Sequence, residues 1–152
     1  MTPMYFSIHH VQLTCPAGSE DTLRKFYVDV IGMSEVTKPE SLRPRGGCWF
    51  RLEAEPGIEL HLGVEADFQP SVKGHPGIVW GDYDRLCALA GRLEAAGHPV
   101  TWDGELHDTP MRLNGAPGSP TVEGGMDRFY VNDPHGNRLE FLSPRLGNGE
   151  CG

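Results

Sequence analysis

The chain lacks the features of nucleic-acid-binding and membrane proteins. Its 152 residues include only 13 Lys and Arg against 21 Asp and Glu, which gives a formal net charge of −8. Binding to a phosphate backbone needs a clustered basic surface instead. No apolar run approaches the roughly 18 residues of a membrane span, and the first residues lack the basic start and apolar stretch of a signal peptide. We therefore expect neither a nucleic-acid nor a membrane partner.

Cysteine is scarce, and its four residues are widely spaced. Cys15, Cys48, Cys87 and Cys151 form no close pair, so neither a disulfide scaffold nor a thiolate zinc site is indicated. We expect reduced thiols in a cytoplasmic protein. The chain also lacks a Gly-x-Ser-x-Gly elbow, a phosphate-binding Gly-x-x-x-x-Gly-Lys loop and a dinucleotide-binding fingerprint. The function classes that depend on these motifs are not indicated.

What the chain does have is an internal repeat. His10 begins a strand-like segment, which continues into a helix-like stretch and reaches Gly32 after 22 residues. His75 begins the same order of segments and reaches Gly97 after 22 residues. A tandem duplication of one βα unit produces such a pattern. It places two side chains that can bind metal at equivalent positions, 65 residues apart.

Apolar periodicity and turn residues predict the elements of each half. Strands are expected over 5–14, 34–38, 47–52 and 58–64, then after His75 and near 100–102, 127–132 and 138–143. Ser19 and Asp82 are expected to cap the two helices at their N-termini. Gly136 and Asn137 are expected to supply positive φ in the turn 133–137. Because Pro76 cannot donate to a strand ladder, the strand after His75 should start late or lie at an edge.

The two halves differ by an insertion. Glu59 aligns with Glu140 at an offset of 81 rather than 65, which leaves about 16 extra residues in the second half. They lie in the Gly- and Pro-rich stretch 107–125, which is either a lid that lines the site or an inert flexible loop. The predicted organisation is a first module over 5–64, a linker over 65–74, a second module over 75–145 and a flexible tail over 146–152.

Three side chains from the two halves could bind one metal ion. Glu140 lies within the apolar segment Leu-Glu-Phe-Leu, where an unpaired buried carboxylate is unfavourable. With His10 and His75 it forms a set of two histidines and one carboxylate, which holds divalent iron, manganese, nickel, cobalt or zinc and leaves positions open for substrate. Taken singly, each residue is also explained as an ordinary strand or loop side chain.

A fourth candidate comes from the equivalent strand of the first half. Glu59 and His61 lie on one face of that strand, and either could be a ligand, a general base or a residue that orients a ligand. Glu59 aligns with Glu140, whereas His61 lies further along the strand. The choice between them stays open. His9 is expected to point away from His10 and has no assigned role.

At these residues the chain resembles the vicinal oxygen chelate superfamily, which contains glyoxalase I, fosfomycin-resistance proteins, extradiol dioxygenases and bleomycin-resistance proteins. The resemblance covers nearly the whole chain. It is carried by His10-Val-Gln-Leu, by Phe26-Tyr-Val-Asp-Val-Ile-Gly-Met33 and by Phe129-Tyr-Val-Asn-Asp-Pro-His-Gly-Asn-Arg-Leu-Glu-Phe141.

This resemblance implies an α+β fold of two tandem βαβββ modules, whose strands form an eight-stranded cup-shaped mixed sheet with the helices outside. Family members carry metal ligands on the first and last strands of each module, at positions that correspond here to His10, Glu59, His75 and Glu140. All four ligands would resemble glyoxalase I, and the set without Glu59 would resemble fosfomycin-resistance proteins and dioxygenases. Family members often pair modules across a homodimer, so two chains could supply one site.

The leading hypothesis is a metal-dependent, glyoxalase-like enzyme that acts on a small oxygenated molecule chelated to a divalent metal ion. Glu59 favours lyase or isomerase chemistry, with dioxygenation and epoxide opening as alternatives, and Glu59 and His61 are the candidate catalytic residues. The main competing hypothesis is a bleomycin-resistance-type protein that sequesters a small molecule without catalysis. A scaffold protein with a vestigial site is the third hypothesis.

Overall fold

Two βαβββ modules follow each other in the computed structural model, which describes residues 7–54, 57–104, 109–113, 118–145 and 151. The first contains β1 (His10–Cys15), α1 (Glu20–Arg24) continued by the π-helical η1 (Lys25–Ile31), β2 (Ser34–Val36), the 3₁₀ segment η2 (Glu40–Arg45), β3 (Cys48–Arg51) and β4 (Glu59–Val64). The second contains β5 (Gly77–Val79), α2 (Tyr83–Ala95), β6 (Thr101–Asp103), β7 (Met111–Arg112), β8 (Thr121–Val122), β9 (Met126–Asn132) and β10 (Arg138–Pro144). This order confirms the predicted tandem α+β architecture.

The eight main strands form two four-stranded sheets with the same topology. Their orders are β1-β4-β3-β2 and β5-β10-β9-β6, and in each sheet the first strand pairs parallel to the last. As Pro76 predicts, β5 begins at Gly77 and lies at an edge. The insertion, expected to be a loop, contains a small hairpin formed by β7 and β8, while its residues 107–108 and 114–117 lie outside the described part.

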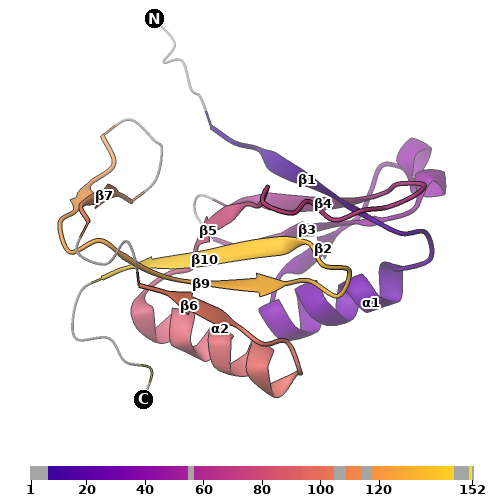
Figure 1. Cartoon of the computed structure of the whole chain (residues 1–152). Helices are drawn as coiled ribbons and strands as arrows, with labels where there is room; N and C mark the ends of the chain where they lie inside the picture. The colour runs from indigo at the N-terminus through magenta and orange to yellow at the C-terminus, as the bar shows by residue number, and fades with distance from the viewer. Residues whose placement is uncertain (1–6, 55–56, 105–108, 114–117, 146–150, 152) are drawn as a thin grey trace, which may run out of the picture.

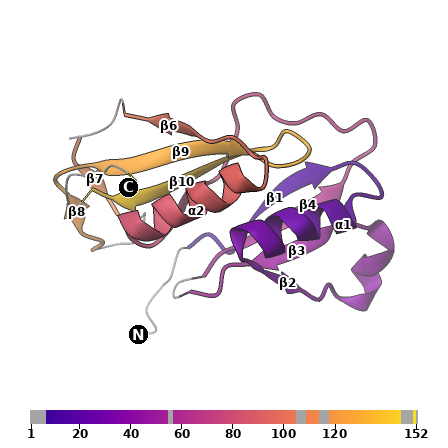
Figure 2. The ribbon, with the colours of Figure 1, turned by 90° about the horizontal axis from the view of Figure 1, so that it is seen from below.

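Both helical segments pack on the same side of the sheets (Figure 1) and lie beside each other when the molecule is seen from below (Figure 2). Arg92 of α2 donates from Nε to the carbonyl of Val30 at 3.0 Å and from Nη2 to that of Ile31 at 3.2 Å. Alternate residues of the sheets, such as Leu60 on β4 and Phe129 on β9, are fully buried in one apolar cluster that includes both modules. Burying each such side chain contributes about 1.5–3 kcal/mol. Among the described residues, no helix is long and apolar enough to cross a membrane.

The helix ends follow the predictions in part. The side chain of Asp82 accepts from the backbone N–H of Arg85 at 2.9 Å, and Gly32 and Gly97 have φ of 95° and 88°, as expected for residues that end helices. Ser19 lies at the N-cap position of α1, as predicted, but its side chain does not cap the helix. Its hydroxyl donates to the carbonyl of Pro16 at 2.6 Å and makes no capping hydrogen bond.

The turn between β9 and β10 joins the two modules. Tyr27 donates its hydroxyl to Asp133 Oδ2 at 2.9 Å, and Asn137 donates from Nδ2 to Asp133 Oδ2 at 2.9 Å and to the carbonyl of Thr14 at 2.8 Å. Gly136 has the predicted positive φ, 91°, but Asn137 does not. Asn137 is needed for the hydrogen bonds of its side chain and not for a left-handed backbone.

The expectation of four reduced thiols is wrong for two of them. Cys87 on α2 and Cys151 form a disulfide across a sequence separation of 64 residues, whereas Cys15 and Cys48 are free and buried. Cys151, predicted within a flexible tail, is thus bonded to α2, and residues 146–150 and 152 lie outside the described part. Pairs this distant in sequence give no local signal of their proximity.

Candidate functional site

Each sheet has a polar face on the side away from the helices. Strand alternation produces it, because residues between the apolar positions of the core point the other way. On β4 the alternation gives Glu59, Leu60, His61 and Leu62, of which the two leucines belong to the apolar cluster. On β10 it gives Leu139, Glu140 and Phe141. Glu59, His61 and Glu140 are nevertheless buried, so their charges and donors need partners within the protein.

In the second module, His75 and Glu140 contact each other. Glu140 lies beside Gly77 in the parallel register of β10 and β5, and its N–H donates to the carbonyl of Pro76 at 3.1 Å. This register places His75 Nε2 at 3.1 Å from Glu140 Oε2. The other ring nitrogen, Nδ1, lies 2.6 Å from the carbonyl of Lys73.

The carbonyl of Lys73 determines how His75 can use its ring. A carbonyl oxygen only accepts, so Nδ1 carries the hydrogen, and the neutral ring then has its lone pair on Nε2. That lone pair faces a carboxylate oxygen, which is also an acceptor. Two acceptors at this distance are favourable only with a cation between or on them, either a proton on the ring or a metal ion. The donor set of His75 and Glu140 therefore fits a divalent metal.

Arg128 of β9 holds the other oxygen of Glu140. Its Nη1 donates to Glu140 Oε1 at 3.0 Å, and its side chain is 7% exposed. Tyr130, opposite Glu140 in the register of β9 and β10, contacts the His75 ring edge-on at 5.5 Å. The sequence reasoning missed both residues. They alternate with Phe129 in a predicted strand, but that strand also contains Asp127 and Asn132, so Arg128 does not stand out in the sequence as Glu140 does within Leu-Glu-Phe-Leu.

In the first module, Glu59 contacts His61 and Arg51. Its Oε1 lies 3.0 Å from His61 Nε2, and its Oε2 accepts from Nη2 and Nε of Arg51 at 2.8 and 3.2 Å. The hydrogen bond with His61, followed by those from Arg51, lowers the pKa of Glu59. Burial lowers the pKa of His61, and its hydrogen bond with Glu59 opposes this shift. Glu59 is thus an ionised carboxylate with both oxygens engaged.

His10 contacts His61 rather than Glu59. The two rings are stacked with centroids 4.1 Å apart, and Trp49 stacks on His61 at 4.1 Å as well. Because β4 lies between β1 and β3, the order of rings is His10, His61, Trp49. His9 was expected to point away, which is wrong, since its Nδ1 lies 2.9 Å from Nδ1 of His10. β1 begins only at His10, so strand alternation does not apply to His9.

The predicted ligands therefore form two separate groups. We call His10, Glu59 and His61 the first half-site, and His75 with Glu140 the second half-site. Within the described part of the chain, no three or more His, Cys, Asp or Glu side chains are arranged to hold a metal ion together.

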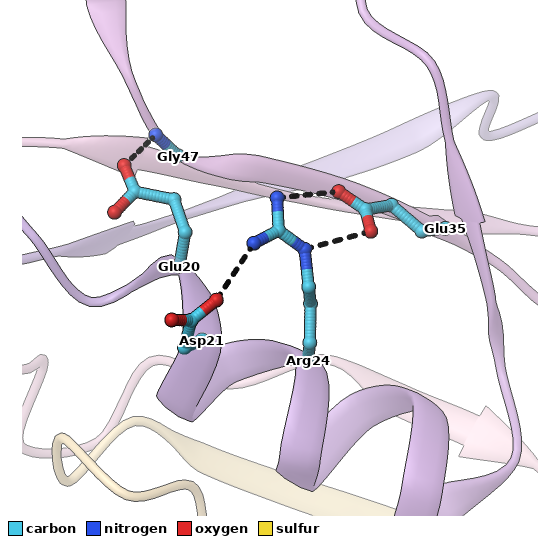
Figure 3. A network of polar contacts seen from close by, with 5 residues as sticks. All are labelled: Glu20, Asp21, Arg24, Glu35 and Gly47. Carbon is cyan, nitrogen blue, oxygen red and sulfur yellow. Dashed lines mark hydrogen bonds and ion pairs between the residues drawn. The ribbon is translucent and has the colours of Figure 1, made fainter.

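A cleft of about 450 Å³ lies elsewhere, beside α1, β2 and η2. Of its lining residues, Arg24 donates to Glu35 and Glu20 accepts from the backbone N–H of Gly47, and Arg24 also donates to the adjacent Asp21 (Figure 3). None of the candidate ligands lines this cleft. It is therefore separate from both half-sites.

No protein-family model matches the chain, and no curated protein does. Solved structures do match. A glyoxalase family protein from Bacillus anthracis has 34% sequence identity and a TM-score of 0.74, over 95% of this chain and 100% of that one. Lactoylglutathione lyase from Agrobacterium tumefaciens has 21% identity and a TM-score of 0.56, over 94% and 97% of the two chains.

A third match is a fosfomycin resistance protein from Listeria monocytogenes, whose structure contains Mn(II) and a dihydroxypropylphosphonic acid. It has 15% identity and a TM-score of 0.63, over 94% of this chain and 95% of that one. At such identities, the second and third matches support the fold alone. The 34% identity with the first, over almost the entire length of both chains, shows that the chain belongs to the glyoxalase family of the vicinal oxygen chelate superfamily.

Proposed function

We propose that the protein is a metal-dependent enzyme that acts on a small molecule with adjacent oxygen atoms. The observation that carries this proposal is the contact between His75 Nε2 and Glu140 Oε2 at 3.1 Å, with Nδ1 held by a backbone carbonyl. A bound divalent ion would act as a Lewis acid toward the chelated substrate. Lyase and isomerase reactions need proton transfer, for which Glu59 and His61 are the candidate residues, and on that ground this chemistry is favoured over dioxygenation and epoxide opening.

We assign the ligand role to His10, His75 and Glu140. Glu59 is the predicted fourth ligand, but Arg51 and His61 already occupy its two oxygens. Glu59 and His61 are then better suited to acid–base work. Burial favours the neutral imidazole of His61, which can accept a proton, and the adjacent Glu59 stabilises the imidazolium that results.

We further propose that the site is completed in a homodimer. The candidate ligands of one chain are divided between two half-sites, and pairing modules across a dimer is frequent in the family that the chain resembles. In a symmetric dimer, the first half-site of each chain would face the second half-site of its partner, which gives two equivalent sites.

Mixing two inactive variants tests the metal site and the dimer together. His10→Ala damages the first half-site, and His75→Ala damages the second. If one site combines half-sites of two chains, a mixed dimer contains one intact site and one doubly damaged site. After equimolar mixing and subunit exchange, we expect about one quarter of the wild-type Zn²⁺ capacity, measured by equilibrium dialysis, whereas each variant alone binds little.

No recovery of Zn²⁺ binding, despite subunit exchange shown by mass spectrometry, would contradict the shared site. Wild-type protein that binds no divalent metal, yet binds a small molecule tightly, would favour the bleomycin-resistance-type binding protein instead. The cytoplasmic location stays a prediction. It was based in part on four reduced thiols, two of which form the Cys87–Cys151 disulfide.

A further inference from the structure

The guanidinium of Arg128 has donors that the contacts of the polar face do not use. This side chain is 7% exposed, and its Nη1 donates to Glu140. Its Nε and Nη2 are buried and have no hydrogen-bond partner among the residues that the structure describes. Asp103, which lies opposite Arg128 in the register of β6 and β9, does not hydrogen-bond either atom.

Nε and Nη2 form one edge of a guanidinium, with two parallel N–H donors that match the two oxygens of a carboxylate. Two other arginines use this edge to bind a carboxylate. Arg24 donates from Nε and Nη2 to the two oxygens of Glu35 at 2.9 and 3.1 Å (Figure 3). Arg51 donates from the same two atoms to a single oxygen of Glu59, Oε2. We call the corresponding, unpartnered edge of Arg128 the open edge.

Leaving the open edge unpaired is unfavourable. Buried donors lose their hydrogen bonds to water, and the loss is larger when the group is charged. Glu140 does not supply the missing acceptor, because it accepts from Nη1 of Arg128 and its other oxygen faces His75. Since native proteins pair nearly all buried donors, two unpaired donors beside a candidate metal pair indicate a contact with a ligand.

We propose that the open edge of Arg128 binds a carboxylate of the substrate, so that the protein acts on small organic acids. The bound carboxylate would lie beside Glu140 and thus near the second half-site. The net charge of −8 repels organic acids at long range, so their recognition requires a local cation with directed donors. This inference rests on the proposed function for the metal-binding role of His75 and Glu140, and adds the charge of the substrate.

NMR of the metal-free, ¹⁵N-labelled protein tests this contact directly. The probe is glycolate, a small hydroxy acid, and hydroxyacetone is its neutral counterpart. We expect glycolate to shift the Nε–H resonance of Arg128, which is assigned by its absence from the Arg128→Lys spectrum. Hydroxyacetone, and chloride at the same ionic strength, should leave it in place. Because both atoms are enclosed, neighbouring side chains have to move as glycolate enters.

Calorimetry on the same proteins gives the size of the effect. Arg128→Lys keeps a positive charge beside Glu140 but has no two-donor edge, and we expect glycolate to bind about tenfold more weakly or worse. Arg24→Lys is the matched control, because Glu35 occupies its edge in a region outside both half-sites. This control should bind glycolate like the wild type.

An Nε–H resonance that glycolate does not move would overturn the proposal, even if Arg128→Lys failed to fold. An equal shift with chloride would also overturn it, since the edge would then bind any anion. Zn²⁺ binding to wild-type protein is measured separately. Its absence would contradict the proposed function, while the glycolate titration of the metal-free protein still decides the role of Arg128.

Discussion

The two half-sites arise from the same topology but use their carboxylates differently. In both modules, a glutamate on the last strand lies between an imidazole and an arginine. In the first, the imidazole is His61, two residues along the same strand, and Arg51 donates twice. In the second, the imidazole is His75, on the segment before the neighbouring strand, and Arg128 donates once.

We infer from this difference that Glu59 supports proton transfer by His61, whereas Glu140 binds a metal ion. Glu59 has its two oxygens engaged, and His10, the repeat equivalent of His75, stacks on His61 instead of facing Glu59. Glu140 presents one oxygen to an imidazole whose other nitrogen is already held. Duplication thus preserved the scaffold, while the two modules diverged in which histidine meets the carboxylate.

The largest expected effect is a difference in Zn²⁺ affinity between variants of the two glutamates, Glu140 and Glu59. Loss of a residue that only orients a ligand weakens metal binding by roughly 10–100-fold. We expect Glu140→Gln to weaken Zn²⁺ binding by more than this. Glu59→Gln should stay within about tenfold of the wild type, because Glu59 is assigned no metal contact. Calorimetric titration of each variant measures both. If both variants lose the same Zn²⁺ affinity, Glu59 is a metal ligand as well, and the set of four ligands resembles that of glyoxalase I.

A second contrast between the modules concerns their cysteines. The disulfide of the second module closes a loop across 64 residues, and a loop of this length restricts the unfolded chain by about 4 kcal/mol. We expect the Cys87→Ser/Cys151→Ser double variant to lose up to that much unfolding free energy in urea. An unchanged stability, with four titratable thiols in the wild type, would show that the bond does not form in solution.

A smaller effect on stability is expected in the turn between β9 and β10, which contacts the first module. Asn137→Ala removes the hydrogen bonds to Asp133 and to the carbonyl of Thr14, and we expect unfolding free energy to fall by about 1–3 kcal/mol. Asn132→Ala is the matched control, because Asn132 is exposed at the end of β9, and should change stability by less than about 0.5 kcal/mol. If both variants lose a similar amount of unfolding free energy, the hydrogen bonds of this turn do not hold the two modules together.

Much of this arrangement could be predicted from the sequence, because it depends on local patterns. The offset between His10 and His75 identified the duplication, and strand alternation placed Glu59 and Glu140 on the polar faces. Pro76 correctly predicted the late start of β5. The capping role of Asp82 and the backbone of Gly136 also followed from the chemistry of single residues.

Contacts between distant segments could not be predicted in the same way. The pairing of Cys87 with Cys151 and the hydrogen bonds of Asn137 depend on how the modules pack, which no local pattern encodes. Arg128 was missed for a different reason. Its strand had been identified, but a lone arginine in a strand is usually exposed, and only the cross-strand register shows that it contacts Glu140.

The smallest effect concerns the thiols of the first module. Burial raises the pKa of Cys48 from its ordinary value of 9.0 to about 11. The unfolded thiol therefore ionises near pH 9 while the folded one keeps its proton, so the contribution of Cys48 to stability is complete below pH 9 and falls toward pH 11. The slope is at most about 1.4 kcal/mol per pH unit for one proton.

Urea unfolding between pH 8 and 11 measures this slope, in the Cys87→Ser/Cys151→Ser background so that no disulfide can exchange. Cys48→Ala in that background should be less stable at pH 8, because it leaves a small cavity, but should lose less stability as the pH rises. The difference between the two curves isolates Cys48 from the other groups that titrate in this range, among them Tyr27, whose pKa burial also raises. Parallel curves would mean that the thiol of Cys48 ionises at the same pH in the folded and unfolded chain, which would place it in contact with water.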